Sequence, residues 1–234
     1  MVYRSATALT AALVIMGMVS GSARAARFDT GLRAVPGASR ELITVTAPRA
    51  SATAGTLTAA VRPTATAPWR RVLGPWPAEL GRHGLSAHRH EGDGTTPIGI
   101  YAIARTLYGN APRPRGLRER YRQLSCGDWW DEDPASPRYN RFVTMPCGVT
   151  PPFAAGSEAL WTETVAYPYF AVLGFNDHPI HRGRDAPGSG IFLHSWIGTP
   201  TAGCVAIHRA QLLSLLRWLA PRRRPVIAIS VDRG

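Results

Sequence analysis

GIFLHSWIGTPTAGCVAI, residues 190–207, places a Gly-Cys pair ten residues after a histidine. The apolar start of this stretch is typical of a strand, so a short loop can bring His194 close to Cys204. A cysteine reacts as its thiolate, and a neighbouring histidine can take the thiol proton. Gly203 permits a sharp turn and lets backbone pass close to a substrate. The stretch predicts a thiol acyl-transfer enzyme with Cys204 as nucleophile and His194 as base.

Each of these residues also has a structural interpretation. Cys204 can be a buried structural cysteine, and His194 can be a core histidine that is satisfied by its neighbours. The N–H groups of Gly203 and Cys204 can form an oxyanion hole, although Gly203 can equally be a plain turn residue. We expect an ion pair between thiolate and imidazolium. A backbone carbonyl or a polar neighbour such as Ser195 must hold the tautomer of His194.

The N-terminal segment is typical of a secretory signal. Residues 6–19 are apolar, and Ala23-Arg24-Ala25 is a small-x-small cleavage pattern. We therefore expect a signal peptide over residues 1–25, a flexible leader over 26–40 and one domain over 41–234. The alternative is an uncleaved N-terminal anchor. The signal predicts a secreted, extracytoplasmic protein, and the basic charge described next predicts its association with the cell wall.

The chain is strongly basic. Its 234 residues carry a net charge of +12, and all 27 basic side chains are arginine. A secreted cationic protein is attracted to anionic polymers such as cell-wall phosphates or a membrane surface. The arginines are scattered and no nucleic-acid motif accompanies them, so we expect no nucleic-acid partner.

Three cysteines in a secreted chain suggest one disulfide and one free thiol. Cys126 and Cys147 flank a loop rich in Trp, Asp and Pro, whereas Cys204 lies in the Gly-Cys turn. We therefore predict a Cys126–Cys147 disulfide and a free Cys204. The alternative is that all three cysteines are reduced and buried.

The remaining pattern predicts a mainly β domain with one amphipathic helix near the C-terminus. The helix is expected over 209–220, where five leucines form a broad apolar face. A long loop is expected over 110–160. Alternating or β-branched runs predict strands at 41–47, 55–62, 69–81, 98–109, 165–176, 190–194, 203–207 and 226–231. Within 69–81 we expect Gly-Pro-Trp-Pro to break the strand.

Three other groups of polar residues allow functional or structural interpretations. His178 and His181 have a spacing that can bind zinc, but Pro179 argues against the helical zinc motif. The Gly-rich acidic loop 91–97 lacks the full ligand pattern of a calcium site, so we interpret it as a solvated turn. Trp129 and Trp130, with their acidic neighbours, can contact glycan and an acceptor amine, or can simply pack the loop on the core. We predict neither a metal nor a cofactor.

Several motifs in order resemble one known family. TAGCVAI (201–207) after IFLH (191–194) looks like the YkuD-type L,D-transpeptidase catalytic domain. The other matches occur in the order seen in its secreted actinobacterial branch. They are GPWPAELGRHGLSAHRHEGDGTTPIGIYAI (74–103), DWWDEDPASPRYNR (128–141), SEALW (157–161) and VLGFND (172–177). The resemblance covers roughly residues 41–231.

The resemblance implies a β-sandwich-like fold and peptidoglycan chemistry. A cysteine attacks the carbonyl of the L-centre of a donor tetrapeptide stem and expels the terminal D-residue. A neighbouring stem amine then takes the acyl group, which makes a 3→3 crosslink. By position, Cys204 matches the nucleophile, His194 the base, Gly203 the preceding glycine and Thr201 the Ser/Thr three residues before the cysteine. We expect Thr201 and Ser195 to contribute to substrate binding. Carbapenems are implied as inhibitors that acylate the cysteine.

The chain departs from the family pattern near the nucleophile. The His-to-Cys interval is short, Ala202 replaces a common His or Lys, and Ala206 replaces a common Arg. The substrate-binding role of that arginine can pass to Arg209 or Arg182, or be absent. An L,D-carboxypeptidase that uses water as acceptor, a non-catalytic wall-binding domain and a metal peptidase remain alternatives. We expect a monomer.

Overall fold

A computed structural model describes Met1, residues 35–154 and residues 156–232. The main sheet contains β1 (Glu41–Ala47), β2 (Ala54–Val61), β3 (Arg70–Glu79), β6 (Gly99–Gly109), β7 (Arg120–Gln123), β11 (Phe170–Leu173), β12 (Phe192–Ser195), β13 (Val205–Ile207) and β14 (Val226–Val231). The smaller elements are β4 (Leu85–Ser86), β5 (Thr96–Pro97), β8 (Asp128–Asp131), β9 (Arg141–Thr144), β10 (Glu158–Ala159), α1 (Arg209–Trp218) and the 3₁₀ turn η1 (Pro221–Arg223).

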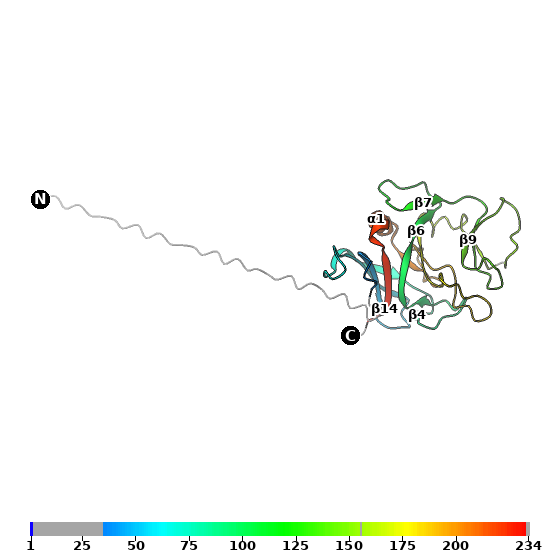
Figure 1. The fold of residues 1–234 in the computed structure, drawn as a ribbon, viewed down its shortest axis with the longest axis horizontal. Helices are drawn as coiled ribbons and strands as arrows, with labels where there is room; N and C mark the ends of the chain where they lie inside the picture. Colours follow the sequence, from blue (N-terminus) through cyan, green and yellow to red (C-terminus); the bar gives the residue numbers. More distant parts are fainter. Residues whose placement is uncertain (2–34, 155, 233–234) are drawn as a thin grey trace.

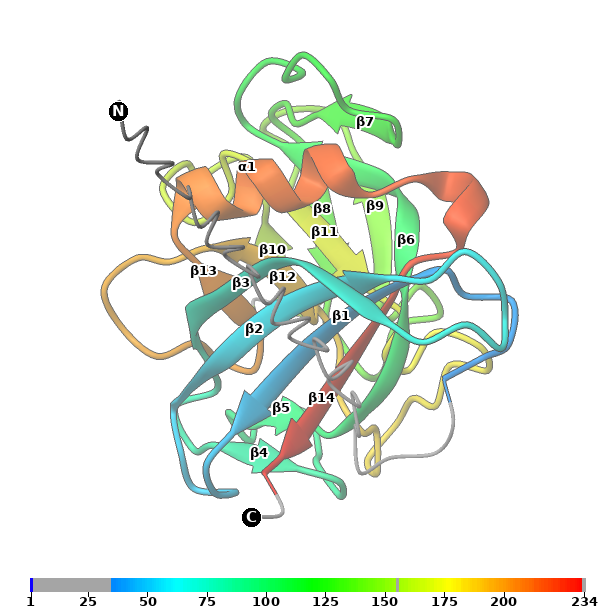
Figure 2. The ribbon, with the colours of Figure 1, turned by 90° about the vertical axis from the view of Figure 1, so that its left-hand side faces the viewer.

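The main sheet closes on itself. Its strand order is β11-β12-β13-β3-β2-β1-β14-β6-β7, and β11 also pairs with β6. Eight strands therefore form a barrel, and β7 extends it at one side through its parallel pairing with β6. Figure 2 shows β1, β2 and β14 side by side across the front of this barrel. The predicted mainly β, sandwich-like fold is confirmed, with a closed sheet enclosing the core.

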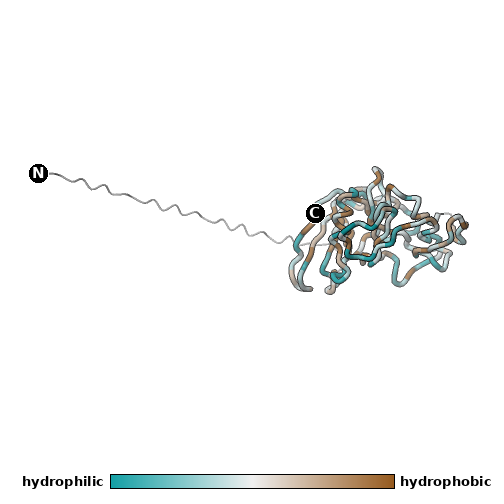
Figure 3. Tube along the Cα trace, turned by 90° about the horizontal axis from the view of Figure 1, so that it is seen from above, coloured by the Kyte–Doolittle hydropathy of each residue, from teal (hydrophilic) through white to brown (hydrophobic). Residues whose placement is uncertain are grey.

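The barrel interior is filled by β-branched and leucine side chains. Ile43, Val45, Leu57, Ile227 and Ile229 are completely buried. Such side chains suit strands because they pack well against neighbours on a pleated surface. Hydrophobic and hydrophilic segments follow one another closely along the trace in Figure 3, as expected for strands with one buried face.

The predicted helix is confirmed as α1, which ends two residues earlier than expected. Leu212, Leu215 and Leu216 are buried at the spacing of one helical face. They join the same cluster as the barrel strands, so the helix covers the sheet (Figure 2). The helix directly follows β13, so the helix and the Gly-Cys turn lie at opposite ends of this short strand.

Two local predictions differ from the structure. The expected Gly-Pro-Trp-Pro break is absent, because β3 continues through these residues with register shifts against β2. On the edge away from β2, strand β3 pairs with β13 only at Glu79. The prolines of β3 therefore remove few hydrogen bonds between strands. The predicted loop 110–160 contains β7 and a small sheet in the order β10-β8-β9. In Figure 1, β9 lies at the side of the domain away from the C-terminus.

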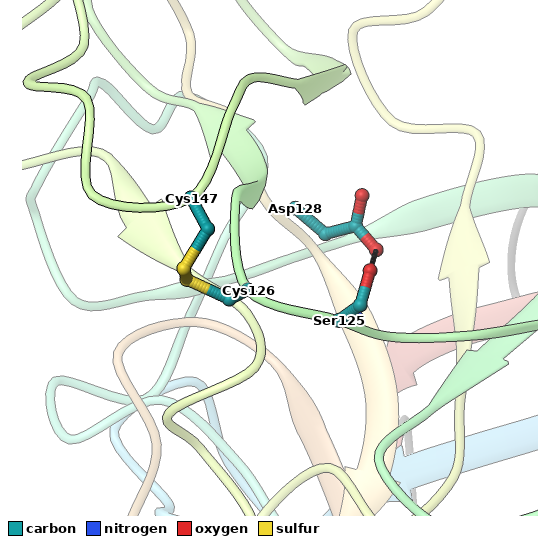
Figure 4. Close-up of a disulfide and its surroundings, with 4 residues drawn as sticks. All are labelled: Ser125, Cys126, Asp128 and Cys147. Carbon is teal, nitrogen blue, oxygen red and sulfur yellow. Dashed lines mark hydrogen bonds between the residues drawn. A yellow bond between two sulfur atoms is a disulfide. The ribbon is translucent and has the colours of Figure 1, made fainter.

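The predicted disulfide joins Cys126 to Cys147 and leaves Cys204 as the free cysteine (Figure 4). It links the start of the β8–β9 hairpin to its end. Next to it, fully buried Asp128 pairs with Arg122 at 2.8 Å and accepts a hydrogen bond from Ser125. The disulfide and this carboxylate together hold the segment that leads into β8.

We expect replacement of both Cys126 and Cys147 by serine to lower the free energy of unfolding by about 3 kcal/mol, because the disulfide closes a loop of roughly twenty residues in the unfolded chain. Urea denaturation of the oxidised wild type and the double variant measures this difference. A loss below about 1 kcal/mol would show that hairpin pairing alone holds the segment.

The expected signal peptide lies outside the described residues, as does most of the expected leader. The part of the leader that the structure describes is attached to the barrel. Arg62, which is buried, donates to the carbonyls of Pro36 and Ser39, and the Arg40 N–H donates to Arg223 O. Among the described residues, no helix has the length and apolar character needed to cross a membrane.

Candidate active site

Two parallel strands bring the Gly-Cys turn to His194. β12 pairs with β13 in the register Leu193 with Val205 and His194 with Ala206. Cys204 immediately precedes β13, and its sulfur accepts a hydrogen bond from the Phe192 N–H at 3.3 Å. Since residues two apart on a strand share a face, Phe192 and His194 point to the same side of the sheet. The topology therefore places the thiol and the imidazole on neighbouring strands within one region.

The Cys204 thiol is buried in the wall of a polar cavity. The residue is 8% exposed, and its S–H donates to Gly190 O at 3.3 Å. Burial raises the pKa of the Cys204 thiol, and the Phe192 N–H opposes this only in part. The resting thiol is therefore protonated, and it would need a base to become a nucleophile.

His194 is held as a neutral base. Its Nδ1 lies 2.8 Å from the backbone carbonyl of Ser195, and since a carbonyl only accepts, Nδ1 carries the proton. Nε2 is then the unprotonated nitrogen. The ring packs edge-on against Tyr167 at 5.3 Å between centroids, and Tyr167 belongs to the same cluster as Cys204. Among the described residues, no hydrogen bond joins the imidazole to the thiol in this conformation.

Burial lowers the pKa of His194 to about 4. The expected ion pair with Cys204 is therefore not the resting state, because burial disfavours both the thiolate and the imidazolium. The resting site contains a neutral thiol and a neutral imidazole. Ser195 contributes its carbonyl, as the sequence allowed, whereas its own buried hydroxyl has no hydrogen-bond partner among the described residues.

This state predicts the pH dependence of the thiol chemistry. Only neutral His194 can accept the thiol proton, so we expect kcat/KM to fall as the pH drops through about 4, and not through the ordinary histidine value near 6.5. The profile is best measured in a Glu158→Gln background, because the pKa of Glu158 is raised to about 7 by burial. An acid limb near 6.5 in that background would contradict a buried neutral His194.

The Thr201 side chain holds the turn before Cys204 through two hydrogen bonds. The Thr201 hydroxyl donates to Cys204 O at 2.8 Å and accepts the Gly203 N–H at 3.1 Å. The Thr201 backbone in turn pairs with the segment around Gly81. Since its hydroxyl is used inside the turn, the structure supports a positioning role for Thr201. The Gly203 N–H is already paired, which leaves the Cys204 N–H as the backbone donor of the expected oxyanion hole.

Gly203 requires the absence of a side chain. Its φ is +144°, and a Cβ there would lie 2.9 Å from Thr95 O and 3.3 Å from the Arg89 guanidinium. This conformation is rare for residues with a side chain. The predicted sharp turn is thus observed, with a charged side chain directly against it.

A cavity of about 150 Å³ opens beside Cys204. Basic and acidic side chains both line it, and residues 202–204 form part of its wall. The residues that line it are Arg82, Arg89, Glu91, Gly92, Glu132, Glu158, Tyr167, Ser189, Gly190, Ile191, Ala202, Gly203 and Cys204. A larger cavity of about 280 Å³, between β6, β9 and β11, is not lined by Cys204.

The two arginines that the sequence suggested for substrate binding do not line the cavity beside Cys204. Arg209, the first residue of α1, lies over the Tyr169 ring. Arg182 is exposed and donates a hydrogen bond to Ser136 O. The arginines at this cavity are Arg82 and Arg89. They lie in the stretch 74–103 that carried part of the family resemblance, but nothing in the sequence pattern distinguished them from the other arginines.

The aromatic-acidic loop has both a packing role and a site role. Trp130 packs against Phe192 and donates to Asn140, so it belongs to the core. Glu132, from the same loop, reaches the cavity together with Glu158 of β10. His178 and His181 are exposed, and no group of three metal-ligating side chains occurs in the described part of the chain.

A family model matches the chain over residues 63–227, which is well over half its length. That model describes the L,D-transpeptidase catalytic domain, YkuD. The chain belongs to the YkuD family. The match includes the Gly-Cys turn, His194 and the acidic residues of the cavity, and YkuD domains act on peptidoglycan peptides. Searches of curated proteins and of solved structures return no match to this YkuD chain.

Proposed function

We propose that this protein is a secreted peptidoglycan L,D-transpeptidase with Cys204 as nucleophile and His194 as base. The observation that supports this most directly is the Cys204 thiol in the cavity wall, at the start of the strand that pairs with β12, which carries His194 with its tautomer set by Ser195 O. Membership of the YkuD family supplies the substrate class. The N-terminal signal pattern supports an extracytoplasmic, wall-associated location.

The proposed reaction has two halves. As the sulfur bonds to the L-centre carbonyl carbon of the donor stem, His194 Nε2 takes the thiol proton. When the C–N bond breaks, the imidazolium passes this proton to the departing amine of the terminal D-residue. An amine of a neighbouring stem then attacks the thioester, loses a proton to His194 and releases the cysteine. One amide bond is exchanged for another, so no cofactor is required.

The neutral resting pair suits this sequence of steps. A buried thiolate would be costly without a compensating cation, whereas a neutral thiol can wait until a carbonyl is present. To attack, the S–H leaves its hydrogen bond to Gly190 O and turns toward His194. In the proposed reaction the Cys204 N–H donates to the carbonyl oxygen and stabilises the negative charge that develops there.

Defined tetrapeptide muropeptides test the proposal. Residues 26–234 and the Cys204→Ala variant are incubated with them, and the products are read by mass spectrometry. We expect a Cys204-dependent crosslinked dimer with loss of the terminal D-residue. Tripeptide monomers alone would instead identify an L,D-carboxypeptidase. If both proteins leave the muropeptides unchanged and the wild type forms no carbapenem adduct, the nucleophile assignment fails and a wall-binding role replaces it.

A carbapenem adduct gives an independent view of the nucleophile. Ring opening by the thiol adds the whole inhibitor mass to the protein, so one adduct on the wild type and none on Cys204→Ala is expected.

We further propose that the protein acts as a monomer, which light scattering during gel filtration measures directly.

A further inference from the structure

Arg89 is a buried cation whose N–H groups are incompletely used. The residue is 8% exposed, and its Nε and Nη1 have no hydrogen-bond partner among the described residues. The Asp93 carboxylate lies 3.5 Å from Nε, but it already accepts hydrogen bonds from His90 and Thr95. A buried guanidinium with unpaired N–H groups is costly unless an anion completes it. An anion beside Arg89 would supply the missing hydrogen-bond partner.

Two glycines, Gly188 and Gly203, leave room for the Arg89 guanidinium beside the Gly-Cys turn. A Cβ on Gly203 would lie 3.3 Å from Arg89 Nη2, and one on Gly188 would lie 2.8 Å from its Cζ. The Phe175 ring supports the guanidinium at 5.2 Å. A planar guanidinium that is fixed in this way matches a carboxylate, to which it can donate two parallel hydrogen bonds.

Acidic side chains line the same cavity. Glu132 and Glu158 both line it, and no described cation is hydrogen-bonded to either side chain. Glu158 accepts a hydrogen bond from the Tyr167 hydroxyl at 2.7 Å. Burial raises the pKa of Glu158 to about 7, and burial together with neighbouring Glu158 raises that of Glu132. These carboxyl groups can become charged when an ammonium enters, because opposite charge favours the ionised form.

We propose that the cavity beside Cys204 is the subsite for the D-residue that leaves the donor stem, with its carboxylate on Arg89 and its amino group facing Glu132 and Glu158. The assignment rests on the proposed function, which supplies a terminal D-residue with a free carboxylate. The volume of about 150 Å³ equals that of about five waters in the liquid, which is room for a small amino acid.

The subsite is occupied differently before and after bond cleavage. In the intact stem the terminal residue presents only its carboxylate, since its nitrogen is part of the scissile amide. When the C–N bond breaks, that nitrogen takes the proton from His194 and becomes a free amine. A further proton, from Glu158 or from water, converts it to an ammonium beside the carboxylates. The released residue then carries a carboxylate that Arg89 can bind and an ammonium that Glu132 and Glu158 can bind.

Three small probes test the subsite on the unaltered protein by NMR titration. They are D-alanine, N-acetyl-D-alanine, which lacks the ammonium, and D-alaninamide, which lacks the carboxylate. We expect D-alanine to bind at least about ten times more tightly than either analogue, with shifts at Gly203 and Cys204. Equal affinities for the three probes, or shifts elsewhere only, would overturn the proposal.

Variants test which side chain recognises the carboxylate and which recognises the ammonium. Arg89→Gln should bring D-alanine and D-alaninamide to within about twofold of each other, and Glu158→Gln should do the same for D-alanine and N-acetyl-D-alanine. Arg182→Gln, which removes an exposed arginine, is the matched control and should keep both preferences. If Arg89→Gln does not fold, Arg89→Lys replaces it, and the carboxylate preference should again weaken. Unchanged preferences in folded Arg89 and Glu158 variants would refute the assignment.

The binding test is independent of the muropeptide reaction. Preferences that hold in a protein that makes no Cys204-dependent product would refute the proposed reaction and retain an amino-acid subsite. Products without preferences would retain the reaction and refute the subsite.

Discussion

Replacing Cys204 with alanine is expected to lower kcat for muropeptides by at least about 10⁴-fold, which corresponds to about 5.5 kcal/mol of lost transition-state stabilisation. The sulfur forms the acyl-enzyme bond in the proposed reaction, and no other cysteine is free to replace it. Cys204 is small, and its thiol makes two long hydrogen bonds, one donated to Gly190 O and one accepted from the Phe192 N–H, so the fold should tolerate the change. Initial rates of product formation, measured with the melting temperature, check this result.

Cys204→Ser is the matched variant. The serine hydroxyl keeps a donor toward Gly190 O and differs chiefly in nucleophilicity, so its rate should also fall by orders of magnitude while its melting temperature stays close to that of the wild type. A Cys204→Ala protein that retained a tenth of the wild-type rate would contradict the nucleophile assignment.

Replacing His194 with glutamine is expected to lower kcat by about 10² to 10⁴-fold with a smaller effect on KM. Glutamine can still donate to Ser195 O, but its amide cannot take the thiol proton. Because burial keeps His194 neutral down to about pH 4, the loss should be similar across the neutral range. Stopped-time assays between pH 5 and 8, roughly the range over which an ordinary histidine titrates, measure it.

His208→Gln provides the control for histidine removal. His208 is exposed, stacks edge-on with Trp196 and precedes α1, and it does not line the cavity. Its replacement should leave kcat within about twofold of wild type. If His208→Gln and His194→Gln reduced kcat equally, the effect would be one of packing around the turn, and the general-base assignment would fall.

Local sequence patterns predicted most of the elements correctly. The strands at 41–47 and 226–231 and the helix after residue 208 appear where alternation and leucine spacing indicate. These signals are local, because side-chain periodicity alone reports which face is buried. The closure of the sheet was not visible in this way, since pairing of β11 with β6 joins segments more than sixty residues apart.

The expected interruption of β3 shows the limit of such rules. Gly and Pro usually punctuate secondary structure, but their cost depends on whether a neighbouring strand needs the missing N–H. β3 pairs with β13 at one residue only, and this arrangement was unknown before the barrel was assembled. The small sheet around the disulfide was overlooked for a similar reason, since its strands are only two to four residues long.

The sequence by itself was enough to predict which residues carry the reactive chemistry. Three cysteines with two flanking one loop left Cys204 free, and the ordered motifs identified the YkuD family and paired Cys204 with His194. These conclusions needed only residue type, order and spacing along the chain, which folding does not alter.

Only the tertiary structure decided the charge state of the pair and the identity of its neighbours. Burial makes both the thiol and the imidazole neutral, and burial is a property of the assembled core. Likewise, Arg89, Glu132 and Glu158 come from three distant segments, and it is barrel closure and the β8–β10 sheet that gather them around Cys204. Electrostatic interactions depend on distance in space and on the surrounding dielectric, and neither can be read from separation along the sequence.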